Sequence, residues 1–448
     1  MKDKLAILRS YAATRYLRKW RSRESFLRWQ EKRIVRHLET VRARSAFYEK
    51  LWRGIPTAEW RTFPAIDKTA MMDHFDELNT VGIRKDEAFE LAIAAEKSRD
   101  FTPVLNGITV GLSSGTSGHR GLFLVSERER FAWAGAVLAK ALPRSLLHRE
   151  KIAFFLRADS RLYGSVESSS IRFEFFDLYE PIDRHIARLN AYRPTLLVGP
   201  PSLLRMLAEA AAAGTLSVAP AKIVSVAEVL DPLDRRVVES AFGQTLHQVY
   251  QCTEGFLAST CPYGTLHFNE DIVCIEKEYV DRSRGKFIPV VTDFSRLAQP
   301  IVRYRLNDLI TERKSCPCGS PFAAIEAIEG RSDDLFYLPS RDGASLVPVF
   351  PDLISRAVLA ATDDLSDYKV IQQGENRILL MLKTPTGVHS DPAAAQVAAS
   401  LGELFRKLGC AVPDLEFAPY RPPEPGVKLR RVERAWRVQG RIGQRMKR

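Results

Sequence analysis

The sequence of 448 residues has no apolar run that approaches the roughly 18 residues of a membrane-spanning helix. Charged residues flank the one short apolar stretch near its N-terminus, so that segment lacks the apolar core of a secretory signal peptide. Six cysteines are too few for a disulfide framework, and the chain contains neither an internal repeat nor a low-complexity segment. These absences predict a cytoplasmic protein without a membrane span.

The composition is that of an ordinary globular chain, with 45% hydrophobic and 27% charged residues. The net charge of +12 is concentrated at the two ends, because residues 1–50 carry 15 Lys and Arg against 5 Asp and Glu, and residues 421–448 carry 10 against 2. Such ends are typical of solvated helix faces, or of contact with nucleic acid, anionic lipid, CoA phosphates or an acidic carrier protein. No zinc-finger spacing or RNA-binding signature supports a specific nucleic-acid module.

The order of apolar segments predicts an α/β protein with two domains. After a basic helical segment at 1–52, apolar strands alternate with helices between about 104 and 251, which is typical of parallel sheets covered by helices. Within this region, strands are expected over 104–112 and 222–230, and a helix from about 232 to 242. From about residue 271, shorter strands with turn signals predict a small barrel-like β subregion. We therefore expect a large N-terminal domain over 1–332 and a small, mobile α+β domain over 333–448.

One loop has the composition of a phosphate-binding site. Ser113-Ser114-Gly115-Thr116-Ser117-Gly118 lies between two apolar, strand-like runs. Glycines let the backbone turn sharply and approach a ligand, and the neighbouring hydroxyl and N–H groups can coordinate phosphate oxygens. The loop is not a Walker A motif, because it lacks the Lys-Ser/Thr pair. By itself it is compatible with a simple turn as well as with a phosphate site.

Six motifs follow one another in the order found in the adenylate-forming superfamily. They are SSGTSGHRG (113–121), SVAEVL (225–230), VYQCTEG (249–255), IVRYRLNDL (301–309), EGRSDDLF (329–336) and PEPGVKLRR (423–431). In turn they resemble the phosphate loop, the Ala/Gly-Glu loop beside the nucleotide, the Tyr-Gly-x-Thr-Glu motif, the Tyr-Arg-x-Gly-Asp motif, the Gly-Arg-x-Asp-Asp hinge and the loop bearing the adenylation lysine. The chain is most similar to the branch of phenylacetate–CoA ligases, CapK-like proteins and coenzyme-adenylating synthetases.

The resemblance implies ATP-dependent activation of a carboxylic acid to an acyl-adenylate, with release of pyrophosphate. Transfer to the thiol of CoA or of a carrier protein's phosphopantetheine would follow. Catalysis of this kind rests on positioning and electrostatic stabilisation. By resemblance Thr253 contacts the α-phosphate, Glu254 holds Mg²⁺, and Lys428 bridges the substrate carboxylate and the α-phosphate.

The resemblance also assigns the nucleotide and acyl sites. The implied nucleotide-binding residues are Ser113, Ser114, Gly115, Thr116, Ser117, Gly118, Ala227, Glu228, Tyr250, Gln251, Thr253, Asp308 and Arg331. Among these, Tyr250 would lie against the adenine, and Asp308 would accept hydrogen bonds from the ribose. Asp333 would be the hinge about which the small domain rotates. The implied acyl pocket, formed by Val198, Gly199, Val226 and Ala227, is apolar and suits an aromatic or fatty acid.

The chain departs from the superfamily pattern at several positions. The phosphate loop ends in His119-Arg120-Gly121 where the superfamily usually has Pro-Lys, so Arg120 is the predicted replacement, with a planar fork in place of a point charge. Gln251 and Asn307 stand where the motifs have Gly, and Val427 separates Gly426 from Lys428. Two alternatives therefore stay open: an adenylyl transferase that stops at an AMP product, and a catalytically reduced relative that acts as a binding protein. A homodimer is compatible with the sequence.

A second cluster has the composition of a zinc site. Cys261 and His267 flank a Pro-Tyr-Gly turn, and Cys316 and Cys318 form Cys-Pro-Cys-Gly some fifty residues later. Three Cys and one His are an accepted tetrahedral zinc set with no open position for a catalytic water. We therefore expect a structural zinc, against the alternative of unpaired thiols in a loop. The other three cysteines lie in apolar contexts typical of a core.

Overall fold

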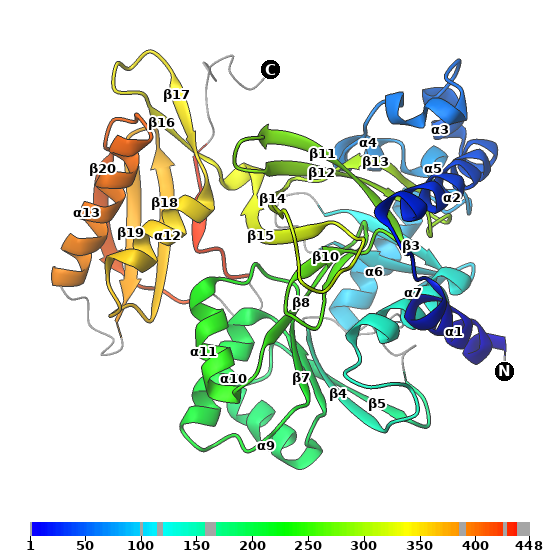
Figure 1. The fold of residues 1–448 in the computed structure, drawn as a ribbon, viewed down its shortest axis with the longest axis horizontal. Helices are drawn as coiled ribbons and strands as arrows, with labels where there is room; N and C mark the ends of the chain where they lie inside the picture. Colours follow the sequence, from blue (N-terminus) through cyan, green and yellow to red (C-terminus); the bar gives the residue numbers. More distant parts are fainter. Residues whose placement is uncertain are drawn as a thin grey trace.

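The computed structural model describes residues 2–98, 102–113, 120–156, 167–384, 391–423 and 428–436. Figure 1 shows a large body formed by the N-terminal three quarters of the chain and a smaller C-terminal body beside it. Within those ranges, none of the helices combines the length and the apolar character that crossing a membrane requires.

The helices are distributed over the whole described chain. They are α1 (Lys2–Ala12), the π-helix η1 (Ala13–Leu17), α2 (Arg23–Arg44), α3 (Ala46–Leu51), the 3₁₀-helix η2 (Thr57–Thr62), α4 (Lys68–Asp73), α5 (Phe75–Leu78), α6 (Lys85–Ser98), α7 (Glu127–Ala141), α9 (Ile182–Tyr192), α10 (Pro201–Ala212), α11 (Pro232–Phe242), the 3₁₀-helix η3 (Ser332–Asp334), α12 (Pro351–Ala361) and α13 (Asp391–Lys407).

The strands in the described part of the chain form four sheets. They are β1 (Val104–Leu105), β2 (Ile108–Leu112), β3 (Leu122–Ser126), β4 (Glu150–Leu156), β5 (Ile171–Asp177), β6 (Leu196–Gly199), β7 (Lys222–Ser225), β8 (Leu246–Cys252), β9 (Gly255–Thr260), β10 (Leu266–Phe268), β11 (Val273–Asp281), β12 (Lys286–Asp293), β13 (Ile301–Arg305), β14 (Asp308–Arg313), β15 (Ala324–Arg331), β16 (Phe336–Pro339), β17 (Leu346–Val349), β18 (Asp367–Gly374), β19 (Arg377–Lys383), β20 (Asp414–Pro419) and β21 (Val432–Arg434).

The largest sheet is parallel along one half and covered on both faces. Strands β5, β4, β6, β7 and β8 run parallel in that order. One apolar cluster joins them to α9, α10 and α11, and another joins the opposite face to α1 and α7. Parallel strands buried on both faces are expected to be apolar at successive positions. The four residues of β6 are all buried, which follows this rule.

The other half of the same sheet is antiparallel. From β8 the order continues through β9, β10, β15, β14, β12 and β11, and β13 pairs with β12. Helices α2 and α3 of the basic N-terminal segment pack against this half in the largest apolar cluster. The predicted α/β class is confirmed. The short strands expected after residue 271 lie with β9 and β10 in the antiparallel half of a sheet that is continuous with the parallel strands.

Helix α11 shows how local sequence sets the ends of an element. The Asp231 side chain accepts a hydrogen bond from the Leu233 amide at 2.8 Å, which satisfies a donor that the helix leaves unpaired. Pro232 occupies the first helical position, where no donor is needed, and Gly243 ends the helix with a φ of 62°. The structure therefore confirms the bounds predicted for this helix, 232–242.

Two segments predicted as single strands are shorter or divided. The strand expected over 104–112 is a hairpin of β1 and β2, because Asn106-Gly107 adopts the positive φ values of a tight turn. The strand expected over 222–230 ends at Ser225. Beyond it Ala227 has a φ of 70°, which is incompatible with a continuing strand.

The C-terminal body has a separate core. Strands β18 and β19 are antiparallel, and β20 and β21 pair in parallel with β19 and β18. Helices α12 and α13 pack on one another and on this sheet, around buried side chains from Phe336 to Val432. We therefore propose the division that the sequence predicts, with a large domain over 1–332 and a small domain over 333–448, the boundary lying within η3.

Candidate functional site

Nine of the predicted site residues line one large cavity. It has a volume of about 950 Å³ and lies where the small domain meets the large one. Five of the six motifs contribute to its wall. The predicted residues that line it are Ser113, Arg120, Gln251, Thr253, Glu254, Asp308, Arg331, Asp333 and Lys428. Residues Ser114, Gly115, Thr116, Ser117 and Gly118 lie outside the described part of the chain.

The Thr253-Glu254 turn lies where the sheet changes from parallel to antiparallel. It joins β8 to β9, so both side chains emerge at the carboxyl end of a parallel strand, where α/β proteins place their ligands. The Thr253 hydroxyl donates to Glu254 at 2.9 Å, and Arg296 donates to the Thr253 carbonyl. Burial and a hydrogen bond to Glu254 raise the pKa of Tyr304, which also lines the cavity. The Tyr304 hydroxyl therefore lies beside the Glu254 carboxylate.

Asp308 begins β14 beside Arg331 of β15. The two are register partners, and burial raises the pKa of Asp308 while Tyr250, Arg331 and Lys428 oppose that rise. The Tyr250 hydroxyl donates a hydrogen bond to Asp308. Tyr250 itself is buried and does not belong to the described lining of the cavity. The cavity wall thus gives no support to the prediction that Tyr250 lies against an adenine.

Lys428 reaches the cavity from the small domain. Burial raises the pKa of both Asp308 and Glu228, and the Lys428 charge opposes that rise at each carboxyl. The Leu429 backbone also bonds to Glu228. Glu228 and Ala227 do not line the cavity in its described part. Glu228 instead contacts the segment that carries Lys428.

Lys68 is a candidate for the cation that the phosphate loop lacks, and none of the motifs identified it. Lys68, at the start of α4, donates from Nζ to the Ser113 hydroxyl at 3.3 Å and lines the cavity. Burial lowers the pKa of Lys68, and Glu254 opposes that effect. Arg120, the predicted replacement, makes two hydrogen bonds to Glu96, at 2.5 and 2.6 Å, with both side chains more than 40% exposed. Lys68 lies 45 residues before Ser113 and outside every motif, so no sequence signal pointed to it.

The predicted acyl residues lie behind the cavity rather than on its described wall. Val198 and Gly199 are buried in β6, and Val198 and Val226 belong to the same apolar cluster as Trp133 of α7. Trp133 does line the cavity. The other apolar lining residues nearby are Ala132, Ala136, Phe256, Ile272 and Phe294.

The four predicted zinc ligands come together. The ligand atoms of Cys261, His267, Cys316 and Cys318 all lie within 4.8 Å of one another. The sulfur atoms of Cys261 and Cys316 are 3.8 Å apart, the separation expected for two thiolates at about 2.3 Å from one tetrahedral zinc. His267 Nδ1 is 3.0 Å from the Phe322 carbonyl, to which it can donate, so that Nε2 is left to face Cys318 as a ligand.

We expect the purified protein to hold about one zinc per chain, because this donor set matches a closed structural site. Cys316→Ser removes one thiolate and should lower both the zinc content and the melting temperature, the latter by several degrees. Elemental analysis and thermal unfolding measure the two effects. Cys410→Ala, a buried cysteine outside the cluster, is the matched control and should keep the zinc. Equal zinc loss in both variants, or none in either, contradicts the assignment.

No protein-family model matches the sequence, and the comparison with curated proteins finds no match. Solved structures do share its fold. The 2-hydroxyisobutyryl-CoA ligase HCL, in the postadenylation state with R3-HIB-AMP, gives a TM-score of 0.63 at 17% identity over 90% of this chain and 88% of the ligase. The amide bond synthetase McbA from Marinactinospora thermotolerans gives 0.52 at 15% identity over 72% and 68%. The anthranilate CoA ligase AuaEII with anthranoyl-AMP gives 0.50 at 14% identity over 72% and 66%.

The chain therefore shares the fold of these solved structures. HCL in the thioesterification state, with 2-HIB-AMP and CoA, matches this chain with a TM-score of 0.50, at 18% identity over 91% of this chain and 90% of the ligase.

Proposed function

We propose that the protein activates a carboxylic acid with ATP, forming an acyl-adenylate and pyrophosphate, and then transfers the acyl group to the thiol of CoA or of a carrier protein. One observation supports this most strongly. The cavity brings Lys428 of the small domain to the same site as Glu254 and Asp308 of the large domain. Three motifs from distant parts of the chain thus meet where one nucleotide and one acid would fit.

In the adenylation step a carboxylate oxygen attacks the α-phosphorus, and the bond between the α-phosphorus and the pyrophosphate oxygen breaks. Negative charge on the phosphoryl oxygens must be balanced by fixed cations and donors. Lys428 and the Thr253 hydroxyl would serve the α-phosphate and the carboxylate, and Lys68 with Ser113 would serve the leaving pyrophosphate. Asp308 would hold the ribose hydroxyls.

The residues fit a magnesium ion bound with ATP. Glu254 supplies one carboxylate at the cavity wall, oriented by Thr253 and Tyr304. Magnesium typically takes one or two carboxylates and completes its shell with phosphate oxygens and water. When bound, the ion would neutralise phosphate charge. Glu254 would hold the ion beside the phosphates.

The acid is proposed to be apolar or aromatic. The ring of Trp133 and the side chains of Ala136, Phe256, Ile272 and Phe294 give one part of the cavity an apolar wall. An apolar wall favours a hydrocarbon group by removing its surface from water. The residues proposed for the acyl pocket, Val198, Gly199, Val226 and Ala227, would support this wall from behind.

The test is acid-dependent ATP–pyrophosphate exchange with a panel of aryl, arylacetic and fatty acids, beside Glu254→Ala as control. Exchange with one group of acids, lost in the control, supports adenylation and narrows the substrate. Absence of exchange with every acid, in folded and zinc-replete protein that binds ATP, counts against the proposed reaction. AMP release that depends on a thiol distinguishes a ligase from an adenylyl transferase, which would release no AMP on adding CoA.

A further inference from the structure

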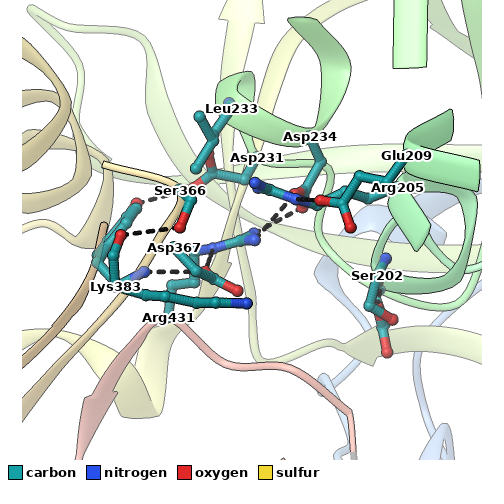
Figure 2. A network of polar contacts seen from close by, with 12 residues as sticks. Ser202, Arg205, Glu209, Asp231, Leu233, Asp234, Ser366, Asp367, Lys383 and Arg431 are labelled. Atoms are coloured by element: carbon teal, nitrogen blue, oxygen red, sulfur yellow. Dashed lines mark hydrogen bonds and ion pairs between the residues drawn. The ribbon is translucent and has the colours of Figure 1, made fainter. Parts of the chain in front are cut away.

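A buried ion-pair network links the two domains close to Lys428. Arg431 of the small domain donates two hydrogen bonds to Asp234 of α11 in the large domain, at 2.6 and 2.8 Å. Its side chain is 7% exposed, and that of Asp234 is 1% exposed. Figure 2 shows the guanidinium group inserted between acidic side chains of both domains. Such a planar, two-point contact fixes orientation as well as distance.

Arg431 and Asp234, which meet across the interface, each also pair with a residue of their own domain. Arg431 Nε donates to Asp367 of β18 at 2.9 Å, so the guanidinium is held within its own domain as well. Arg205 of α10 donates to Asp234 at 3.2 Å from within the large domain. A second bond crosses the interface beside it, from the Tyr368 hydroxyl to Asp231 at 2.8 Å. Asp231 also caps α11, so the acidic side of the network is anchored to a helix end.

We propose that Arg431 is a positioning residue for adenylation: its contact with Asp234 fixes the small domain in the orientation that puts Lys428 into the nucleotide cavity. This inference rests on the proposed function. Arg431 lies three residues after Lys428, and between them Leu429 contacts Glu228 while Arg430 pairs with Asp334 of η3. The segment is thus tied to the large domain at Glu228 and Asp234, on both sides of Arg430.

For the second step, the transfer of the acyl group to a thiol, the contact between Arg431 and Asp234 would have to open. Rotation of the small domain would separate Arg431 from Asp234, because the two residues belong to different domains. Asp234 would keep Arg205, and Arg431 would keep Asp367, so neither charge would be left without a partner. An unpaired buried charge would make it very costly to separate Arg431 from Asp234. The partners within each domain lower that cost. The contact can therefore hold one orientation and still be released.

The test compares Arg431→Met, Asp234→Asn and the double variant with the unchanged protein. Arg377→Met is the matched control, since Arg377 pairs with Glu416 inside the small domain at an exposed site. Acid-dependent exchange reports adenylation, and small-angle X-ray scattering reports the relation of the two domains. We expect each single variant to lose about tenfold or more in exchange and to increase in radius of gyration, and the double variant to lose no more than the worse single.

Several outcomes decide the matter. Arg431→Lys keeps the charge without the two-point contact, so an intermediate loss supports the positioning role. Variants that melt as one folded species yet show unchanged scattering and exchange within twofold of the parent overturn it. Losses that add in the double variant also overturn it, because the two side chains would then act separately. If the parent catalyses no exchange with any acid, the proposed function fails, and scattering alone still decides whether Arg431 holds the domains together.

Discussion

Lys428→Ala should lower acid-dependent ATP–pyrophosphate exchange by about 100- to 1000-fold, the range found when one preorganised charge-stabilising donor is removed from an active site. Lys428 is the small-domain cation at the cavity, and its charge already acts on Asp308 and Glu228. Binding of ATP should change little, because Lys428 acts where charge develops between the carboxylate and the α-phosphate. Exchange assays and calorimetry with ATP separate the two effects.

The matched control for Lys428 is Lys369→Ala. Lys369 also belongs to the small domain, but it pairs with Glu433 at 3.3 Å and does not line the cavity. The Lys369→Ala variant should retain nearly full ATP–pyrophosphate exchange. A loss of only a few fold in Lys428→Ala, or an equal loss in Lys369→Ala, would show that the small-domain cation does not take part in adenylation.

Lys68→Ala should lower exchange by about 100-fold and weaken ATP binding, whereas Arg120→Ala should have a much smaller effect. The reason is geometric. Lys68 is partly buried, contacts Ser113 and feels the charge of Glu254, so it lies beside the base of the phosphate loop. Arg120 is engaged by Glu96 at an exposed site, where an ion pair contributes little.

The comparison of these two variants is decisive because both remove one cation from the same cavity. Steady-state kinetics with varied ATP gives kcat and KM for each. Lys68→Met, which keeps the length of the side chain, checks that lost packing against Gly121 is not the cause. If Arg120→Ala lost exchange while Lys68→Ala kept it, the cation that the sequence predicts would be the correct one.

The sequence was most informative where a pattern is local and long. Helix α11 was predicted with its bounds because Asp231, Pro232 and Gly243 each carry a local signal. The parallel strands were predicted because double burial makes them continuously apolar. The order of the six motifs indicated the fold and the residues that meet at the cavity, such as Glu254 and Lys428.

The parts that the sequence did not reveal depend on distant neighbours. Lys68 faces Ser113 only because α4 packs beside the start of the phosphate loop, and Arg431 meets Asp234 across 197 positions of the chain. The part of the cavity wall formed by α7 was not predicted from the sequence either. Trp133 occupies the cavity surface and leaves Val198 in the core behind it, which depends on the packing of a helix on a sheet.

The most direct test of adenylation uses an acid, chosen by the exchange panel, whose carboxylate oxygens are labelled with oxygen-18. The reaction is run with ATP and CoA, and the products are analysed by mass spectrometry. Attack of the carboxylate on the α-phosphorus predicts AMP that carries a single labelled oxygen, with unlabelled pyrophosphate. Label in inorganic phosphate, or ADP in place of AMP, would mean that the acid attacks the γ-phosphorus and would contradict adenylate formation.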